Sequence, residues 1–222
     1  MATKEQYQPD TSEFETRERA FEKNIQVTRM AESVRLALMV VALLAGLTIV
    51  GTSANTLSVY DKTHVSTDFL LPLSGVWPSE FDLRPTIALV TCGTIIAITS
   101  AIALIASKAS SIRYNPLIHS TVSCIASAIC LIAGLVGTSF YYGVNRSDTV
   151  FSLQAWTCQF SHVPMTQAPH WGALCKESKA ALYLTVMIIP LEVLVLGFSA
   201  YVSSAEKKQL VIRERKGSPA MS

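Results

Sequence analysis

One acidic residue, Glu192, lies deep inside an apolar stretch of this chain, with Pro190 two residues before it. A carboxyl group inside a bilayer is costly and is by default a candidate functional site. Glu192 could serve as a proton or cation site, helped by a backbone carbonyl that Pro190 leaves without its helical partner. Alternatively, it is a neutral glutamic acid that hydrogen-bonds to a neighbouring helix. Arg35, at the edge of another apolar stretch, is expected to extend toward water rather than reach Glu192.

The five cysteines fall into two groups. Cys92, Cys124 and Cys130 lie inside apolar stretches, where a thiol behaves as a small apolar side chain. Cys158 and Cys175 lie outside them, and an oxidising compartment would join the two. Such a disulfide closes a loop of about 18 residues and contributes about 3 kcal/mol to stability. Two unpaired thiols are the alternative.

Other catalytic and ligand-binding patterns are missing from the sequence. No C-x-x-C, P-loop, G-x-S-x-G or H-E-x-x-H motif occurs, and no histidine lies deep in an apolar stretch. His162 and His170 share a segment with Cys158 and Cys175, which permits only a nonspecific metal site. We therefore predict no enzymatic activity, no cofactor and no metal.

Four apolar stretches must position these residues. Half of the 222 residues are hydrophobic and only 15% are charged, fewer than a soluble surface requires. Each stretch approaches or exceeds the roughly 20 residues that cross a bilayer as a helix, and none has a polar stripe. A buried core of a soluble protein is the disfavoured alternative. We predict an all-α fold, a four-helix transmembrane bundle with a disulfide-pinned outer loop between its third and fourth helices.

The domain boundaries follow from these stretches. The expected parts are an N-terminal arm at 1–33, a transmembrane domain at 34–202 with helices at about 34–57, 86–106, 117–142 and 180–202, and a tail at 203–222. Ser12 and Glu15 have the spacing of a capping box, so a helix is expected to run from about Ser12 into the membrane. No cleavable signal peptide is evident, and the first stretch is expected to act as a signal anchor.

The distribution of basic residues predicts the orientation. Thirteen of the eighteen Lys and Arg residues lie in the two terminal segments and the short middle loop, if Arg35 at the edge of the first apolar stretch is counted with the N-terminal arm. The positive-inside rule places these segments in the cytoplasm. The helix lengths suit the plasma membrane or late secretory pathway, and Asn145 in the second outer loop is a possible glycosylation site. The net charge of +2 does not favour nucleic acid as a partner.

The second outer loop, about 143–179, combines the cysteine pair with aromatic residues. Trp156, Phe160 and Trp171 surround Cys158 and Cys175 along the sequence. Rings and a disulfide give a short segment a fixed shape without a full core. These rings are candidates for recognition of a partner, and capping of the bundle is the other interpretation.

Small residues recur at four-residue spacing in two helices. Small side chains at this spacing allow helix backbones to approach closely in lipid. The pattern indicates a tight bundle and leaves self-association open. The two lines are Gly93, Ala97 and Ala101 in the second helix, and Ala126, Cys130 and Gly134 in the third.

The layout resembles that of the MARVEL-like and Casparian-strip-like tetraspan membrane proteins. The run Trp156-Thr157-Cys158, with Leu174-Cys175-Lys176-Glu177-Ser178-Lys179-Ala180-Ala181, looks like that of uncharacterised four-helix membrane proteins of filamentous fungi. The chain lacks the first-loop cysteines of claudin-like and Sur7-like proteins and the Cys-Cys-Gly of tetraspanins.

The resemblance implies a non-enzymatic organiser of membrane domains or an accessory subunit. Its partners would be the lipid bilayer and other membrane proteins or a second copy. The alternative is a small transporter or channel-type subunit that uses Glu192, and a membrane-embedded enzyme ranks third.

Overall fold

The computed structural model describes residues 11–63, 77, 81–108, 116–145, 151–163 and 169–217. Four long helices, one short helix and two strands of two residues each make up the regular structure of this part of the chain. In order they are α1 (Thr11–Thr63), β1 (Phe81–Asp82), α2 (Arg84–Lys108), α4 (Pro116–Asn145), β2 (Phe151–Ser152), α5 (Leu153–Gln159) and α6 (Trp171–Gly217).

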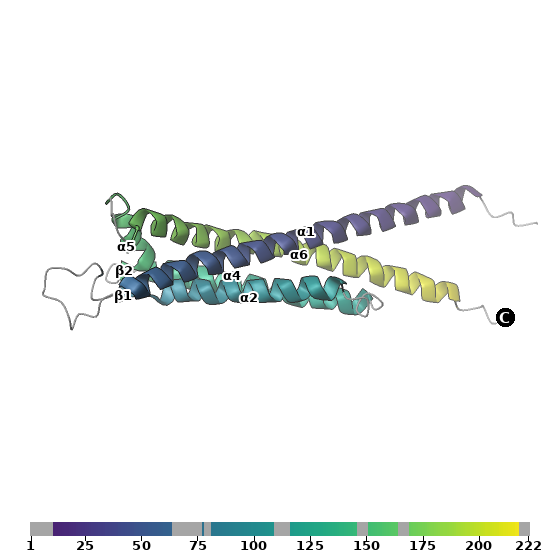
Figure 1. Cartoon of the computed structure of the whole chain (residues 1–222). Helices are drawn as coiled ribbons and strands as arrows, with labels where there is room; N and C mark the ends of the chain where they lie inside the picture. Colours follow the sequence, from purple (N-terminus) through teal and green to yellow (C-terminus); the bar gives the residue numbers. More distant parts are fainter. Residues whose placement is uncertain are drawn as a thin grey trace, which may run out of the picture.

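The four long helices form one antiparallel bundle (Figure 1). Going around it, α1 packs on α2, α2 on α4, α4 on α6, and α6 again on α1, whereas α2 and α6 face each other diagonally. All four are long and apolar enough to cross a membrane, over Ile25–Thr63, Arg84–Lys108, Thr121–Val144 and Trp171–Ala205. The predicted all-α four-helix transmembrane bundle is therefore confirmed.

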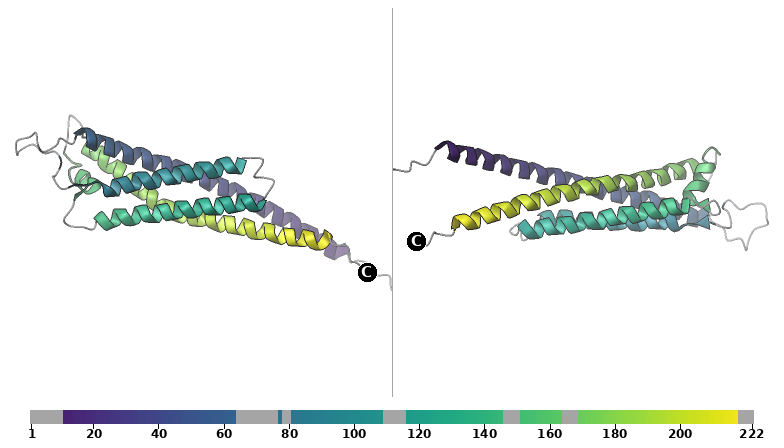
Figure 2. Two further views of the ribbon diagram at one scale, coloured as in Figure 1. Left: turned by 90° about the horizontal axis from the view of Figure 1, so that it is seen from below. Right: turned by 180° about the vertical axis from the view of Figure 1, so that it is seen from behind.

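The two ends of the bundle differ in construction. At one end, called the disulfide end, lie α5 and the parallel pair of β1 and β2, in which Phe81 is opposite Phe151. At the other, the terminal end, α1 and α6 continue past α2 and α4 and diverge as two arms (Figures 1 and 2). The N-terminal arm is helical from Thr11, within one residue of the predicted start near Ser12.

The start of the last helix was predicted too late. The sequence suggested about residue 180, but α6 begins at Trp171, and the His170 carbonyl accepts bonds from the amides of Ala173 and Leu174, each at 3.1 Å. The segment from 171 to 179 is charged and therefore looked like a loop. It also contains Ala, Leu, Lys and Glu, which are good helix formers, so the helix continues beyond the apolar stretch toward the disulfide end.

Local signals explain where the other helices begin. Asp82 Oδ1 accepts a 2.8 Å bond from the Arg84 amide at the start of α2. Pro116 opens α4 at a position where its missing N–H costs nothing. Ser152 caps α5 by accepting a 3.2 Å bond from the Ala155 amide. Several hydroxyl groups within the apolar helices bond to the preceding turn; the Thr185 hydroxyl, for example, donates to the Ala181 carbonyl at 2.8 Å.

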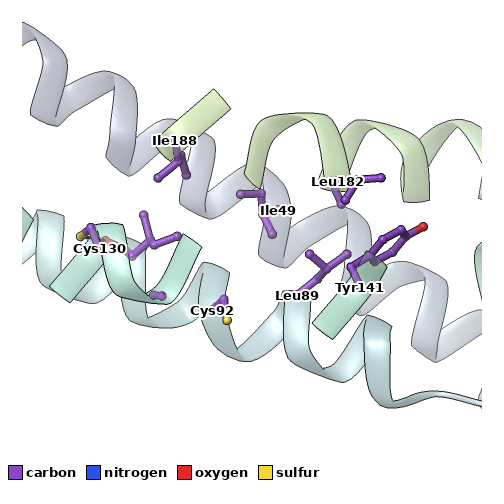
Figure 3. Packing of buried hydrophobic residues seen from close by; sticks show 10 residues of the cluster. Ile49, Leu89, Cys92, Cys130, Tyr141, Leu182 and Ile188 are labelled. Atoms are coloured by element: carbon purple, nitrogen blue, oxygen red, sulfur yellow. Dashed lines mark hydrogen bonds between the residues drawn. The ribbon is translucent and has the colours of Figure 1, made fainter. Parts of the chain in front are cut away.

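The core runs along the bundle axis and contains side chains from all four helices. Figure 3 shows its largest cluster, in which Ile49 of α1, Leu89 and Cys92 of α2, Cys130 and Tyr141 of α4, and Leu182 and Ile188 of α6 lie together. A smaller cluster with Met39, Ala103, Ala126 and Val195 continues it toward the terminal end. The interval between Ile188 and Val195 is where α6 places Glu192.

Candidate functional site

Glu192 lies on the inward face of α6 and is 3% exposed. Ile188, Val195 and Ser199 share that face at spacings of three and four residues, and all three are buried. Pro190 is exposed and lies about 200° around the helix from Glu192. The carbonyl that Pro190 leaves without a helical partner is that of Val186, which lies about 120° around the helix from Glu192.

Two α4 side chains hydrogen-bond to the Glu192 carboxyl group, namely the Ser127 hydroxyl and the Cys130 thiol. The Cys130 sulfur also lies 3.9 Å from Ser100 Oγ and 4.0 Å from the Ile96 carbonyl oxygen of α2. Ser100, Ser127 and Cys130 are all buried. These four side chains, called the Glu192 cluster (Glu192, Ser127, Cys130, Ser100), therefore join α2, α4 and α6 through polar contacts.

More polar residues continue from this cluster toward the terminal end. Ser123 Oγ of α4 lies 3.4 Å from Ser199 Oγ of α6. Ser123 also borders a small interior pocket beside Arg35, together with Met39, Ala103, Ala106, Ser107 and Val122. The Glu192 cluster, the Ser123–Ser199 pair and Arg35 therefore form a column of polar side chains, called the polar column, in the interior toward this end of the bundle.

The exposure of Arg35 differs from what the sequence predicted. It was expected to extend toward water, yet it is 1% exposed. Its side chain borders a small interior pocket together with residues of α2 (Ala103, Ala106, Ser107) and of α4 (Val122, Ser123). A side chain can extend to water only where its helix is uncovered, and the sequence did not show that this face of α1 is turned toward the ends of α2 and α4.

The interior pocket beside Arg35 is small, which limits what the polar column could hold. Its volume is about 10 Å³, close to the space that one water requires, and Glu192 does not line it. Within the part of the chain that the structure describes, no group of three His, Cys, Asp or Glu side chains could hold a metal ion. The Glu192 cluster is therefore built as a set of interhelical hydrogen bonds within packed side chains.

The disulfide end carries a second candidate feature. The predicted bond between Cys158 of α5 and Cys175 of α6 is present. Beside it lies a small aromatic core, here called the cap, formed by Trp77, Leu153, Trp171 and Leu174 with Val59, Tyr60, Leu83, Trp156 and Phe160 packed against them. Trp77 lies between Tyr60 and Trp171, with ring centroids 4.9 Å from each.

The cap changes the interpretation of the aromatic recognition candidates. Trp171 is buried in it, and Trp156 and Phe160 are half-buried with ring centroids 4.6 Å apart. Trp77 is also buried, and it donates from Nε1 to Thr63 Oγ1 at 3.0 Å. These rings close the bundle, which is the second interpretation offered by the sequence. Asn145 is the last residue of α4 rather than a loop residue, and its side chain lies outside the described ones.

The small-residue lines lie at contacts between neighbouring helices. A Cβ on Gly46 of α1, which the sequence analysis missed, would be 3.0 Å from the Ala97 nitrogen and 3.2 Å from the Gly93 oxygen. Gly134 faces α6, where a Cβ would be 3.5 Å from Ile189 Cγ1. Ala126 and Cys130 are buried, and Ala101 is half-buried. The signal for Gly46 was present, because Ala42 precedes it at the same four-residue spacing.

Both features, the Glu192 cluster and the cap, are thus made of contacts that hold helices together. The polar contacts lie in the middle and at the terminal end of the bundle, and the aromatic contacts with the disulfide lie at the other end. No family model, curated protein or solved structure matches the chain.

Proposed function

We propose that the protein is a non-enzymatic tetraspan membrane scaffold or accessory subunit, which acts through helix packing and its disulfide-pinned cap. The observation that carries this proposal is the environment of Glu192. Its carboxyl group is buried, is hydrogen-bonded to Ser127 and Cys130, and lies between the two apolar core clusters. A carboxyl held in this way serves as a link between helices, which suits a rigid membrane module.

The helix faces turned away from the core support the same proposal. α2 presents Ile95, Ile98, Ile102 and Ile105, and α4 presents Ile129, Ile132 and Phe140, all more than 40% exposed. Such surfaces suit lipid or the helices of another membrane protein. The resemblance to MARVEL-like and Casparian-strip-like tetraspans, together with the distribution of basic residues, favours the plasma membrane or late secretory pathway with cytoplasmic termini.

Substitutions on the exposed surface of the cap test the scaffold proposal. Gln159 ends α5 and is exposed, so Gln159→Arg changes this surface without entering the aromatic core. Gln26→Arg is the matched control, because Gln26 is an exposed glutamine on the N-terminal arm. We expect Gln159→Arg to lower the yield of proteins crosslinked to the chain in intact membranes at least threefold, and Gln26→Arg to leave it unchanged. Equal crosslinking in both variants would argue against a cap that binds partners.

A second candidate function, proton or cation movement through Glu192, is favoured by the polar column. The Glu192 cluster, the Ser123–Ser199 contact and Arg35 follow one another toward the terminal end. If this column carries protons, Glu192→Gln abolishes flux measured with a pH-sensitive dye in liposomes that contain the purified protein. If the protein is a scaffold, wild type and Glu192→Gln both give the flux of protein-free liposomes, and both fold.

A further inference from the structure

The interior pocket beside Arg35 has the size and the polarity of a site for a single water molecule. Its volume of about 10 Å³ is close to the space that one water requires. Arg35 and Ser123 are both buried and bring a guanidinium and a hydroxyl group to its lining. The lining comes from three helices, namely α1 (Arg35, Met39), α2 (Ala103, Ala106, Ser107) and α4 (Val122, Ser123).

The polar groups of the lining include both donors and acceptors. A buried water binds where about two to four polar groups can hold it. The guanidinium of Arg35 only donates. The Ser107 hydroxyl donates to the Leu104 carbonyl at 2.7 Å, and its oxygen can still accept. The Ser123 hydroxyl, 3.4 Å from Ser199 Oγ, can also accept. A water between these groups can therefore accept from Arg35 and donate to a serine.

Apolar side chains lie between this pocket and the Glu192 cluster. They belong to the second core cluster, here called the apolar layer (Met39, Ala103, Ala126, Val195), and all four are buried. On α2, α4 and α6, the member of this layer separates a residue of the Glu192 cluster from a serine nearer the terminal end. On α6, for example, Val195 lies between Glu192 and Ser199, which are about 10 Å apart along the helix. The polar column is therefore crossed by packed hydrocarbon.

We propose that the interior pocket beside Arg35 binds one water molecule, which joins α1 to α2 and α4, and that the apolar layer keeps this water away from the Glu192 cluster. A bridging water is enthalpically almost as favourable as a direct hydrogen bond. The Glu192 cluster joins α2, α4 and α6, so the water adds α1 to the polar contacts between helices. This site goes beyond the proposed scaffold function and does not depend on it.

Radiolytic labelling tests the water site, because hydroxyl radicals formed from a bound water oxidise the side chains beside it. Met39 borders the pocket and is only 6% exposed, so its conversion to the sulfoxide reports water in the pocket. The full-length protein in lipid nanodiscs receives a short X-ray pulse, and mass spectrometry of its peptides measures oxidation. Met187 is the internal reference, because it is 65% exposed but lies within the membrane span Trp171–Ala205, where its neighbours are lipid.

Substitutions that fill the pocket show whether the label comes from this water. Ala103→Val enlarges a lining side chain, and Ser123→Thr does so while keeping the hydroxyl group. The second variant keeps the test valid if the first does not fold. Ala37→Val is the matched control, because Ala37 lies on α1 between Arg35 and Met39 in the sequence but is exposed on another face.

The proposal predicts that wild-type Met39 is oxidised about tenfold faster than Met187, because water rather than hydrocarbon lies beside it. Both filling variants lower the rate at Met39 to that of Met187, and Ala37→Val leaves it unchanged. Cys130 is a free, buried thiol on the other side of the apolar layer, so it stays unoxidised in every variant.

Each part of the proposal can fail separately. The pocket is dry if wild-type Met39 is oxidised no faster than Met187. The water lies elsewhere if both filling variants leave Met39 oxidation at the wild-type level. Oxidation of Cys130 at the rate of Met39 would overturn the separation by the apolar layer, and would favour proton movement through Glu192 instead.

Discussion

At the scale of single residues, two glycines set how closely α1 and α2 approach. A Cβ on Gly46 would press against backbone atoms of α2, and one on Gly93 would be 2.8 Å from Ile49 Cγ2. Backbone atoms cannot move aside as the end of a long side chain can. The smallest side chain is therefore required at this contact, as is common where helices associate in lipid.

Replacing Gly46 by Ala is expected to lower the free energy of unfolding by about 1–3 kcal/mol, the usual cost of overpacking. Gly51→Ala on the same helix is the control, because a Cβ there meets nothing within 4 Å. That variant should gain up to about 1 kcal/mol from helix propensity. Unfolding of the purified variants in detergent measures both. The glycine contact is not required if both variants are equally stable.

The burial of Glu192 could be predicted from residue types alone, but its hydrogen-bond partners could not. Its isolation in an apolar stretch predicted a buried polar site, and the structure buries it. Its partners Ser127 and Cys130 could not be predicted from the sequence, because apolar helices have no polar face that reveals which side meets a neighbour. From the sequence, Cys130 was expected only to act as a small apolar residue in a helix contact.

At the scale of elements, the disulfide end is built from pieces distant in the sequence. α5 is only seven residues long and is held by the Cys158–Cys175 bond to α6. Trp77, from the segment before α2, fills the space between Tyr60 of α1 and Trp171 of α6. Asn55 Nδ2 of α1 also donates to Glu177 Oε2 of α6 at 2.8 Å. A short helix becomes stable here because several elements converge on it.

Removing the disulfide should loosen α5 selectively. We expect the double variant Cys158→Ser and Cys175→Ser to lose about 3 kcal/mol of stability, because the bond restricts the unfolded chain. Amide hydrogen exchange should accelerate in α5 and remain slow in α2 and α4. Cys124→Ser serves as the control, since Cys124 is a free, half-buried thiol. Unchanged exchange in α5 would mean that the cap alone holds it.

At the scale of the whole molecule, the even number of long helices brings both described chain ends to the same side of the bundle (Figure 1). The disulfide lies at the opposite end, because α5, which contains Cys158, lies there beside the strand pair. The basic residues of the sequence predict that the terminal end faces the cytoplasm. An oxidised cysteine pair at the other end is consistent with that orientation.

A membrane-impermeant thiol label on intact cells tests the orientation. Cys158 and Cys175 should be labelled only after reduction, because the disulfide end is expected to face outward. The three remaining cysteines lie within α2 and α4 and should stay unlabelled. Labelling that requires permeabilised cells would instead indicate the inverted orientation or an internal membrane.

The sequence by itself determined the helices, their apolar character, the disulfide and the burial of Glu192. These follow from composition and local spacing, because a backbone in lipid must satisfy its own hydrogen bonds and therefore forms helices. Only the tertiary structure decided which faces meet. The burial of Arg35 beside α2 and α4, and the position of Trp77 between Tyr60 of α1 and Trp171 of α6, depend on contacts between helices. The approach of α1 to α2 is likewise set by the contact of Gly46 with Gly93, two residues far apart in the sequence.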